Sequence, residues 1–294
     1  MYSLEKRKAT AAWIFLLPSF MGFIIFSAIP IISSLGLSFT EWDTISGPPK
    51  FLGIKNYMDI LKSEELWAVL GHTLYFIVLY IPLILIISIA VANLLNTNFK
   101  GVGVYRIIYF IPVLTSWVAG SLVWKWLLSD EYGPINALLG YVGIDGPAWL
   151  QDQTWAIPGI VMASLWKDMG YFSLILLGGL QSINPVYYEA AEVDGATRWE
   201  RFIKITLPLL SPTLLFVLII TIINSFQLFP QVMIMTQGGP HGATQVMVER
   251  IYTYAFKYYK MGYASAYSWI LFVIIFAVTF IQMRLQERWV TYES

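Results

Sequence analysis

Long apolar stretches alternate with short polar connections along the whole of this chain. Each stretch is long enough to cross the ~30 Å hydrocarbon core of a membrane, which takes roughly 20 helical residues. The pattern therefore predicts six membrane-spanning helices, at about Ala12–Phe39, Trp67–Leu95, Val104–Leu128, Trp155–Leu180, Leu207–Met235 and Ala264–Leu285. Two short helices are also expected in the connections, near Asn136–Val142 and Gln245–Met261. No long linker interrupts the series, so we expect residues 1–294 to form one all-α integral membrane domain.

The composition supports lipid as the main solvent of this chain. It is 57% hydrophobic and 12% charged, whereas soluble domains carry about 25% charged residues. The net charge of zero argues against a nucleic-acid-binding surface. The absence of cysteine excludes disulfides and thiol chemistry. The two histidines, His72 and His241, lie far apart in sequence, so we expect no metal site.

Basic residues near the ends of the spans indicate the orientation. A basic cluster, Lys6–Lys8, precedes the first span, and the connection Asp130–Asp152 contains no Lys or Arg. Because cytoplasmic connections carry the excess of basic residues, we expect both termini in the cytoplasm. A cleaved secretory signal is the alternative for the N-terminus. The first apolar run is longer than such a signal and contains Pro18 and Pro30, which favours an uncleaved span.

The polar connection between the fourth and fifth spans, residues 184–206, predicts two short helices. Asn184 can cap the first helix, because its side chain accepts from a free backbone N–H. Thr197, followed three residues later by Glu200, matches the capping box that starts a helix. Gly195 lies between them and permits a turn that other residues resist. A connection with this much local order indicates a docking element.

This connection resembles the EAA loop of binding-protein-dependent ABC importer permeases. Glu189-Ala190-Ala191, three residues, Gly195, nine residues and Ile205-Thr206-Leu207-Pro208 meet every spacing of that motif. Ser38–Trp42, Phe51–Tyr57 and Thr236–Pro240 resemble motifs of the sugar-type branch, which includes maltose and glycerol-3-phosphate permeases. The resemblance implies the type I ABC importer permease architecture, with six transmembrane helices and a cytoplasmic EAA coupling helix. The chain lacks the large outer domain of some maltose-type subunits.

The resemblance also implies two docking surfaces. In that family the first helix of the EAA loop is the coupling helix, which sits in a cleft of the ATP-hydrolysing subunit. The residues expected to couple to the ATPase are Tyr187, Glu189, Ala190, Ala191, Asp194 and Gly195. The alternative is a capped, solvated connection without a partner. The residues expected to dock the solute-binding protein on the outer side are Gly238, Gly239 and Pro240.

Polar side chains within the fourth and fifth spans mark a candidate substrate path. Such groups are costly in lipid and usually face water or the protein interior. They are Lys167, Asp168, Tyr171, Thr221, Asn224, Ser225 and Gln227. All but Gln227 lie at the distances from the EAA glutamate at which maltose-type permeases contact substrate, so the resemblance implies sugar contacts. Trp117 and Phe226 are possible aromatic platforms, and the alternative is hydrogen bonding between helices.

Lys167 and Asp168 are adjacent and opposite in charge. Lys167 either neutralises Asp168 or extends toward the outer interface. Its position about midway along the span favours the internal pair.

No nucleotide-binding or catalytic motif occurs in the chain. It lacks the G-x-x-x-x-G-K-[ST] phosphate loop and any clustered nucleophile and base. We therefore expect a non-catalytic subunit without a cofactor of its own. The resemblance implies two separate ATPase subunits that bind ATP and Mg²⁺, a second homologous permease subunit in a heterodimer, and an extracellular or periplasmic solute-binding protein.

The predicted function is import of a carbohydrate across the bacterial cytoplasmic membrane by alternating access. A disaccharide, an oligosaccharide, a polyol and glycerol phosphate all remain open as the solute. Two alternatives of other classes remain. A secondary transporter would work without an ATPase and is expected to show internal repeats. A membrane-embedded enzyme would need a titratable cluster, which only Lys167 and Asp168 approach.

Overall fold

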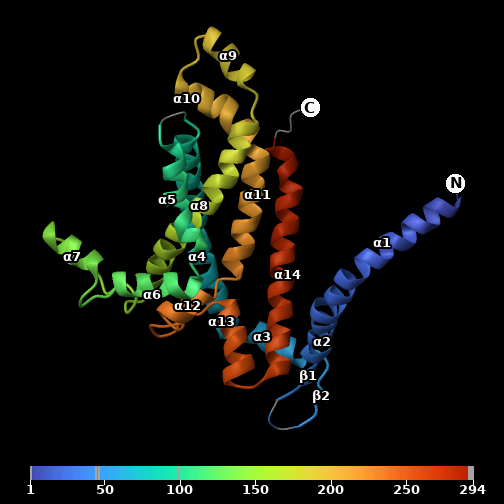
Figure 1. Cartoon of the computed structure of the whole chain (residues 1–294). Coiled ribbons are helices and arrows are strands. Elements are labelled where there is room, and N and C mark those ends of the chain that lie inside the picture. The colour runs from blue at the N-terminus through green and yellow to red at the C-terminus, as the bar shows by residue number, and fades with distance from the viewer. Residues whose placement is uncertain (1, 44, 46, 98–99, 291–294) are drawn as a thin grey trace. The chain divides into compact units, whose positions relative to one another are not determined.

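The structure is a computed structural model that describes residues 2–43, 45, 47–97 and 100–290, most of them in helices (Figure 1). Its contacts divide the chain into two compact units. One consists of Met1–Ser63 with Ile251–Ile270, and the other of Glu64–Arg250 with Leu271–Ser294.

The first unit begins with a long helix. α1 (Tyr2–Phe23) continues through a π-helical segment (Ile24–Ala28) into α2 (Ile29–Ser38) without a break. The wide π-helical turn precedes Pro30, whose nitrogen cannot donate to a carbonyl in the preceding turn. Residues Ala11–Ser38 are long and apolar enough to cross a membrane, which confirms the first predicted span.

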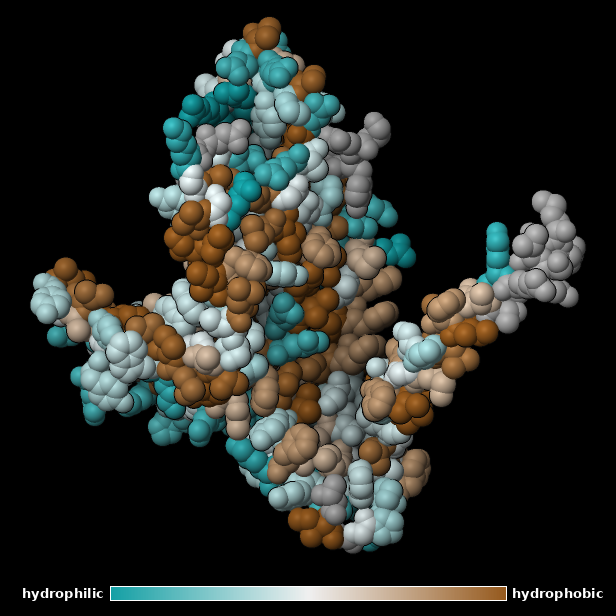
Figure 2. All heavy atoms as spheres, viewed as in Figure 1, coloured by the Kyte–Doolittle hydropathy of each residue, from teal (hydrophilic) through white to brown (hydrophobic). Residues whose placement is uncertain are grey.

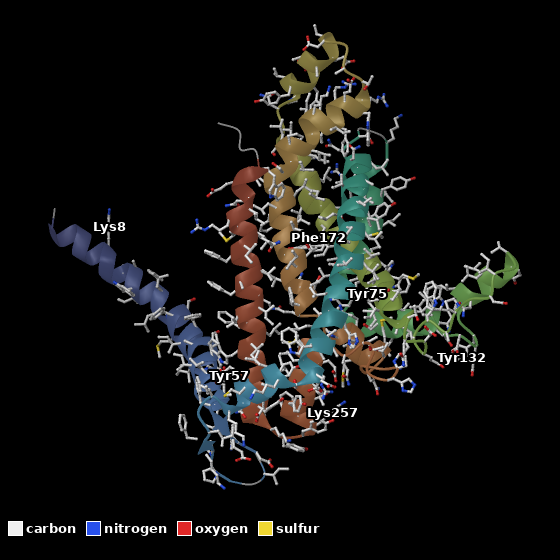
Figure 3. All side chains as sticks on the ribbon, turned by 180° about the vertical axis from the view of Figure 1, so that it is seen from behind. Lys8, Tyr57, Tyr75, Tyr132, Phe172 and Lys257 are labelled. Carbon is white, nitrogen blue, oxygen red and sulfur yellow. The ribbon has the colours of Figure 1, made fainter. Side chains whose placement is uncertain are left out.

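A short ribbon and a short helix follow α2 in the same unit. They are the antiparallel strands β1 (Thr40–Glu41) and β2 (Lys50–Phe51), and α3 (Lys55–Lys62). The buried Asn56 joins α3 to the end of α2, because its amide donates to the Ser38 carbonyl at 3.0 Å. Tyr57, labelled in Figure 3, donates its hydroxyl to the Ser38 Oγ at 2.6 Å.

A helix bundle forms the core of the second unit. Its main helices are α4 (Glu64–Leu95), α5 (Val102–Leu114), α8 (Ala156–Ser182) and α11 (Leu207–Phe226). α8 packs against the other three (Figure 1). Phe172 of α8, labelled in Figure 3, is 1% exposed and belongs to this core together with Phe76 and Ile84 of α4. α4 and α8 confirm the second and fourth predicted spans.

Two glycines of α8 let its neighbours approach closely. A Cβ atom at Gly170 would lie 2.0 Å from the Tyr109 carbonyl oxygen of α5. A Cβ atom at Gly179 would lie 2.5 Å from the Thr213 Oγ1 of α11. Small residues at helix contacts are typical of membrane bundles, where close backbone approach replaces the hydrophobic driving force of water.

The third predicted span, Val104–Leu128, is not one straight helix. α5 ends at Leu114 and α6 (Trp117–Leu127) leaves it at 97°. Thr115 and Ser116 are extended, and the Ser116 Oγ caps α6 by accepting from the Ala119 N–H at 3.2 Å. The prediction of a single helix is therefore wrong. Hydropathy is high on both sides of the break, so it gives no sign that a new helix begins at the Ser116 cap.

The fifth predicted span, Leu207–Met235, is displaced toward the N-terminus. A continuous helix runs over Arg198–Phe226, from α10 (Arg198–Arg201) through a π-helical segment (Phe202–Thr206) into α11. It ends at Phe226, and α12 (Pro230–Met235) is a separate helix. Pro230 explains the boundary, since proline cannot donate an N–H and disfavours helical backbone in the residue before it.

The remaining helices complete the described chain. They are α7 (Pro134–Tyr141), α9 (Pro185–Val193), α13 (Met247–Tyr252) with a π-helical segment (Thr253–Lys257), α14 (Met261–Leu285) and a 3₁₀ turn (Gln286–Arg288). α14 confirms the sixth predicted span, and α7 and α13 confirm the two short connecting helices. Over the described ranges, five helices can cross a membrane by length and composition, or six if the bent pair α5–α6 is one span.

Candidate functional site

A cavity of about 200 Å³ lies in the second unit, where five helices meet. α4 contributes Phe76 and Tyr80, α6 contributes Trp117, and α8 contributes Ser164 and Asp168. The end of α11 and the start of α12 complete the lining with Asn224, Ser225, Gln227, Leu228, Pro230 and Gln231. The early end of α11 at Phe226 is what brings residues 227–231 across the cavity.

A hydrogen bond orients the carboxylate of Asp168 in this lining. Tyr80 is 3% exposed and donates its hydroxyl to the Asp168 Oδ2 at 2.6 Å. The Phe76 ring stacks on the Tyr80 ring at a centroid distance of 5.0 Å. Because one carboxylate oxygen of Asp168 accepts from Tyr80, the other is held in a defined direction. The cavity thus joins an aromatic wall to a fixed hydrogen-bond acceptor.

Lys167 lies beside Asp168 in sequence but bonds to the backbone at the α5–α6 break. Its Nζ donates to the carbonyl oxygens of Pro112 at 3.2 Å, Val113 at 3.2 Å and Thr115 at 2.6 Å. The same atom lies 5.2 Å from the centroid of the Trp117 ring. Carbonyls at the end of a helix lack the N–H donors of a following turn, and here the ammonium group supplies a charged donor. The Pro112 carbonyl also accepts from the Thr115 N–H at 3.2 Å and from the Thr115 Oγ1 at 2.7 Å. The expected pair of Lys167 with Asp168 is replaced by these contacts.

The expected helix pair between the fourth and fifth spans is present as α9 and α10 (Figure 1). The Asn184 Oδ1 accepts from the Val186 N–H at 3.1 Å and caps α9. Thr197 and Glu200 form the predicted capping box at the start of α10. Gly195 has φ +78°, the left-handed backbone that glycine adopts without strain. The sequence therefore predicted the helix pair α9 and α10 correctly from local signals.

Two side-chain contacts fasten α9 to the first part of the continuous helix Arg198–Phe226. The Arg201 Nη1 forms an ion pair with the Glu192 Oε2 at 3.0 Å. The Tyr188 hydroxyl lies 3.0 Å from the Thr206 Oγ1, within hydrogen-bond distance. Since α10 continues into α11, these contacts connect α9 to the helix that lines the cavity.

α9 and the turn that follows it carry the residues predicted to couple to an ATPase. Tyr187, Glu189, Ala190, Asp194 and Gly195 are exposed, and Ala191 is partly buried. Val193 is 88% exposed and adds an apolar side chain at the same end. Figure 2 shows isolated brown spheres among teal ones at the end that carries α9 and α10, and broader brown areas along the helices below. An exposed helix that mixes apolar and charged residues is suited to a protein partner.

The predicted docking loop, Gly238 to Pro240, has a defined shape. The Thr244 Oγ1 donates to the Gly239 carbonyl at 2.6 Å and lies 2.7 Å from the Thr236 Oγ1. Gly239 and Pro240 line a second cavity of about 380 Å³, together with residues near the end of α6 such as Lys125 and Asp130.

A protein-family model identifies the chain. The model described as "Binding-protein-dependent transport system inner membrane component" matches residues 69–291. The chain belongs to this family.

Relatives extend the match to almost the full length of this permease. It is 37% identical to the probable ABC transporter permease protein YesP of Bacillus subtilis, over 98% of this chain and 94% of the relative. It is 33% identical to the trehalose/maltose transport system permease protein MalF of Thermococcus litoralis, over 96% and 95%. It is 31% identical to the lactose transport system permease protein LacF of Rhizobium radiobacter, over 95% of both chains.

Solved structures share the fold of this permease. A chain of a bacterial alginate ABC transporter, crystallised in complex with an alginate pentasaccharide-bound periplasmic protein, superimposes with a TM-score of 0.85. The match covers 97% of this chain and 96% of that chain at 23% identity, so it concerns the fold. The permease is an integral inner-membrane protein with the all-α type I architecture.

The permease brings together four of the seven predicted path residues, namely Asp168, Asn224, Ser225 and Gln227. The other three lie elsewhere. Lys167 holds the α5–α6 break, and Tyr171 is 42% exposed with its ring edge-on to Phe172. Thr221 is buried and donates its hydroxyl to the Val217 carbonyl at 2.6 Å. Substrate contact by any of these seven residues stays a prediction.

Several cavity residues were not anticipated from sequence. Tyr80 and Phe76 lie four residues apart on α4, and Ser164 lies four residues before Asp168 on α8, so helical spacing could have indicated them. Gln231 gave no signal, because its position depends on where α11 ends. Of the two possible aromatic platforms, Trp117 lines the cavity, whereas Phe226 is buried outside its lining.

Proposed function

We propose that this permease forms one half of the membrane path of a carbohydrate importer. A solute-binding protein would deliver the substrate, and ATP hydrolysed on two separate ATPase subunits would drive its passage. One observation carries the proposal. A single continuous helix over Arg198–Phe226 is fastened to the exposed α9 at one end and contributes to the cavity lining at the other.

The length of this helix suits it to couple two distant sites. Its 29 residues span about 43 Å at 1.5 Å per residue. We infer that α9 and α10 face the cytoplasm, together with both chain termini, and that Gly238, Gly239 and Pro240 face the solute-binding protein on the outer side. Closure of the ATPase subunits would then move α9 and tilt α11. This movement exchanges inward and outward access, because α9 makes different contacts in the two states.

The substrate class rests on relatives and on the cavity together. The named relatives include permeases of trehalose/maltose, lactose and starch degradation product transport systems. The cavity offers amide, hydroxyl and carboxylate groups beside the rings of Phe76 and Trp117. Polar groups that match sugar hydroxyls, placed next to an aromatic surface, are the chemistry that a pyranose ring requires.

A second, homologous permease subunit would complete the path. Asn224 and Gln227 line the cavity yet are exposed in the isolated chain. Exposed amides at the depth of a membrane core are costly unless another protein surface or water covers them. We therefore place the partner permease over this side of the cavity. The chain itself would hold no cofactor, since ATP and Mg²⁺ would bind to the ATPase subunits.

Cross-linking from α9 tests the proposal. Because the chain contains no cysteine, Ala190→Cys creates a single thiol for a photoreactive maleimide in native membranes. We expect an adduct with an ATP-binding subunit, identified by mass spectrometry. Val142→Cys, which is also exposed but lies after α7, is the matched control and should give no such adduct. No ATPase adduct at Ala190, or ATP-independent uptake by this chain alone in liposomes, would contradict the proposal.

A further inference from the structure

Gln231 is a buried glutamine whose amide oxygen has no protein partner. It is the second residue of α12 and is 6% exposed. Within the described part of the chain, no hydrogen bond reaches its Oε1. Buried polar atoms are almost always paired in folded proteins, so an unpaired one at a cavity is expected to meet a bound molecule.

The surroundings of Gln231 are rich in hydrogen-bond acceptors. Gln231 shares the cavity lining with Asp168, whose Oδ2 already accepts from Tyr80 at 2.6 Å. Among the described residues of this lining, Asp168 is the one charged side chain. The nearest basic residue in sequence, Lys167, donates to three backbone carbonyls and is not part of the lining. The cavity therefore offers acceptors to a molecule with hydrogen-bond donors, and the described residues of its lining include no basic side chain to pair with an anion.

The hydroxyls of the two serines in the lining are already used as donors. The Ser164 Oγ donates to the Ile160 carbonyl at 2.9 Å, and the Ser225 Oγ donates to the Thr221 carbonyl at 2.7 Å. Their oxygens can still accept. This arrangement again favours a molecule that brings its own O–H groups.

We propose that the Gln231 Oε1 accepts a hydrogen bond from a hydroxyl of the transported carbohydrate, and that the sugar ring entering this cavity is uncharged. The inference rests on the proposed function. Sugar hydroxyls supply the missing donors, and the rings of Phe76 and Trp117 supply the apolar surface. A uronate carboxylate in the same place would face Asp168 with no basic side chain among the described residues of the lining, and like charges repel strongly away from water.

The variant Gln231→Met separates sugar contact from a structural role. Methionine has a similar length but no amide oxygen. Because the variant removes an unpaired buried polar atom, the thermal midpoint of the detergent-purified chain should stay the same or rise. Transport should nevertheless fall. A structural role would instead lower the midpoint.

The measurement is chain-dependent uptake by cells of the native host, with each variant replacing the wild-type chain. The probes are radiolabelled maltose, trehalose and lactose as uncharged sugars, and digalacturonate as a charged one. Capture by the solute-binding protein is the same in every strain, so the maximal rate reports on the permease. We expect Gln231→Met to lower the rate for the transported uncharged sugar roughly 3- to 10-fold, the effect of one hydrogen bond. Gln282→Met is the matched control, because the amide of Gln282 of α14 likewise has no partner among the described residues but does not line the cavity.

Each result decides a different point. An unchanged rate in Gln231→Met, or chain-dependent uptake of digalacturonate at a rate equal to the uncharged sugars, would overturn the inference and leave the carbohydrate importer intact. If none of the four sugars shows chain-dependent uptake, the carbohydrate assignment fails, and the inference fails with it.

Discussion

The ammonium nitrogen of Lys167 lies 2.6 Å from the carbonyl oxygen of Thr115, at the corner between α5 and α6. A lysine in the middle of one membrane helix thus stabilises a 97° bend in another segment of the chain. The same bend places Trp117 at the cavity. Lys167 acts on the candidate site through the position of α6 and not through the cavity lining.

Lys167→Met should destabilise the protein. It removes the charged donor shared by three carbonyl oxygens, of which only that of Pro112 is also bonded by Thr115 in the described hydrogen bonds. The expected cost is roughly 2–3 kcal/mol. Thermal unfolding of the detergent-purified chain measures the effect. Lys167→Arg keeps a donor group and should recover part of the loss. Equal midpoints for Lys167→Met and the wild type would contradict the role assigned to Lys167.

Gly170→Ala should weaken the contact between α8 and α5. The new Cβ would lie 2.0 Å from the Tyr109 carbonyl oxygen, which belongs to the backbone and cannot move aside. Overpacking of this kind costs about 1–3 kcal/mol. Gly178→Ala is the control on the same helix, because nothing lies within 4 Å of its Cβ position. Thermal unfolding should show the control unchanged or more stable by up to about 1 kcal/mol, from better helix propensity.

Gly195→Ala should reduce co-purification of the ATPase with this chain. The residue has φ +78° and open space around it, so alanine is strained by its backbone angle alone, at about 1–2 kcal/mol. Part of that strain is relieved if the turn between α9 and α10 changes shape. Gly143→Ala imposes a similar strain at φ +76°, also in open space but after α7. Quantitative immunoblotting should show several-fold loss of ATPase for Gly195→Ala only, and equal yields would contradict the coupling role.

Tyr80→Phe should lower both stability and uptake. It removes the donor to the buried Asp168, a charged hydrogen bond worth about 1.5–3 kcal/mol, and lets the carboxylate turn. Tyr75→Phe on the same helix is the control. Tyr75, labelled in Figure 3, is 43% exposed, so this variant should change stability by less than about 0.5 kcal/mol. Thermal unfolding and the uptake assay described above check both variants. Wild-type uptake in Tyr80→Phe would mean that the orientation of Asp168 has no part in transport.

The elements that sequence predicted correctly depend on local chemistry. Asn184, Gly195, Thr197 and Glu200 act on their immediate neighbours, so the helix pair α9–α10 follows from a short stretch of residues by itself. The lengths of α4, α8 and α14 followed from hydropathy for the same reason. Asp168 was recognised as a candidate because a carboxylate inside an apolar helix is rare.

The features that sequence missed depend on contacts between distant segments. The corner at Thr115 needs Lys167, which lies 52 residues later in the chain. The partner of Asp168 is Tyr80, 88 residues earlier, and the two meet only because α4 packs against α8. Gln231 was not predicted as a cavity residue for a related reason. Its place across the cavity follows from the end of α11 at Phe226.

The unbroken helix from Arg198 to Phe226 also fixes an angular relationship. Each residue of an α-helix turns the next by about 100°, so the number of residues between Thr206 and Asn224 sets the direction in which Asn224 points relative to the contacts of α9. Inserting one residue into α11 would rotate the cavity side chains by that angle while leaving both ends folded. Spacing along this helix is therefore a functional property of the chain, independent of the identity of the apolar residues that fill it.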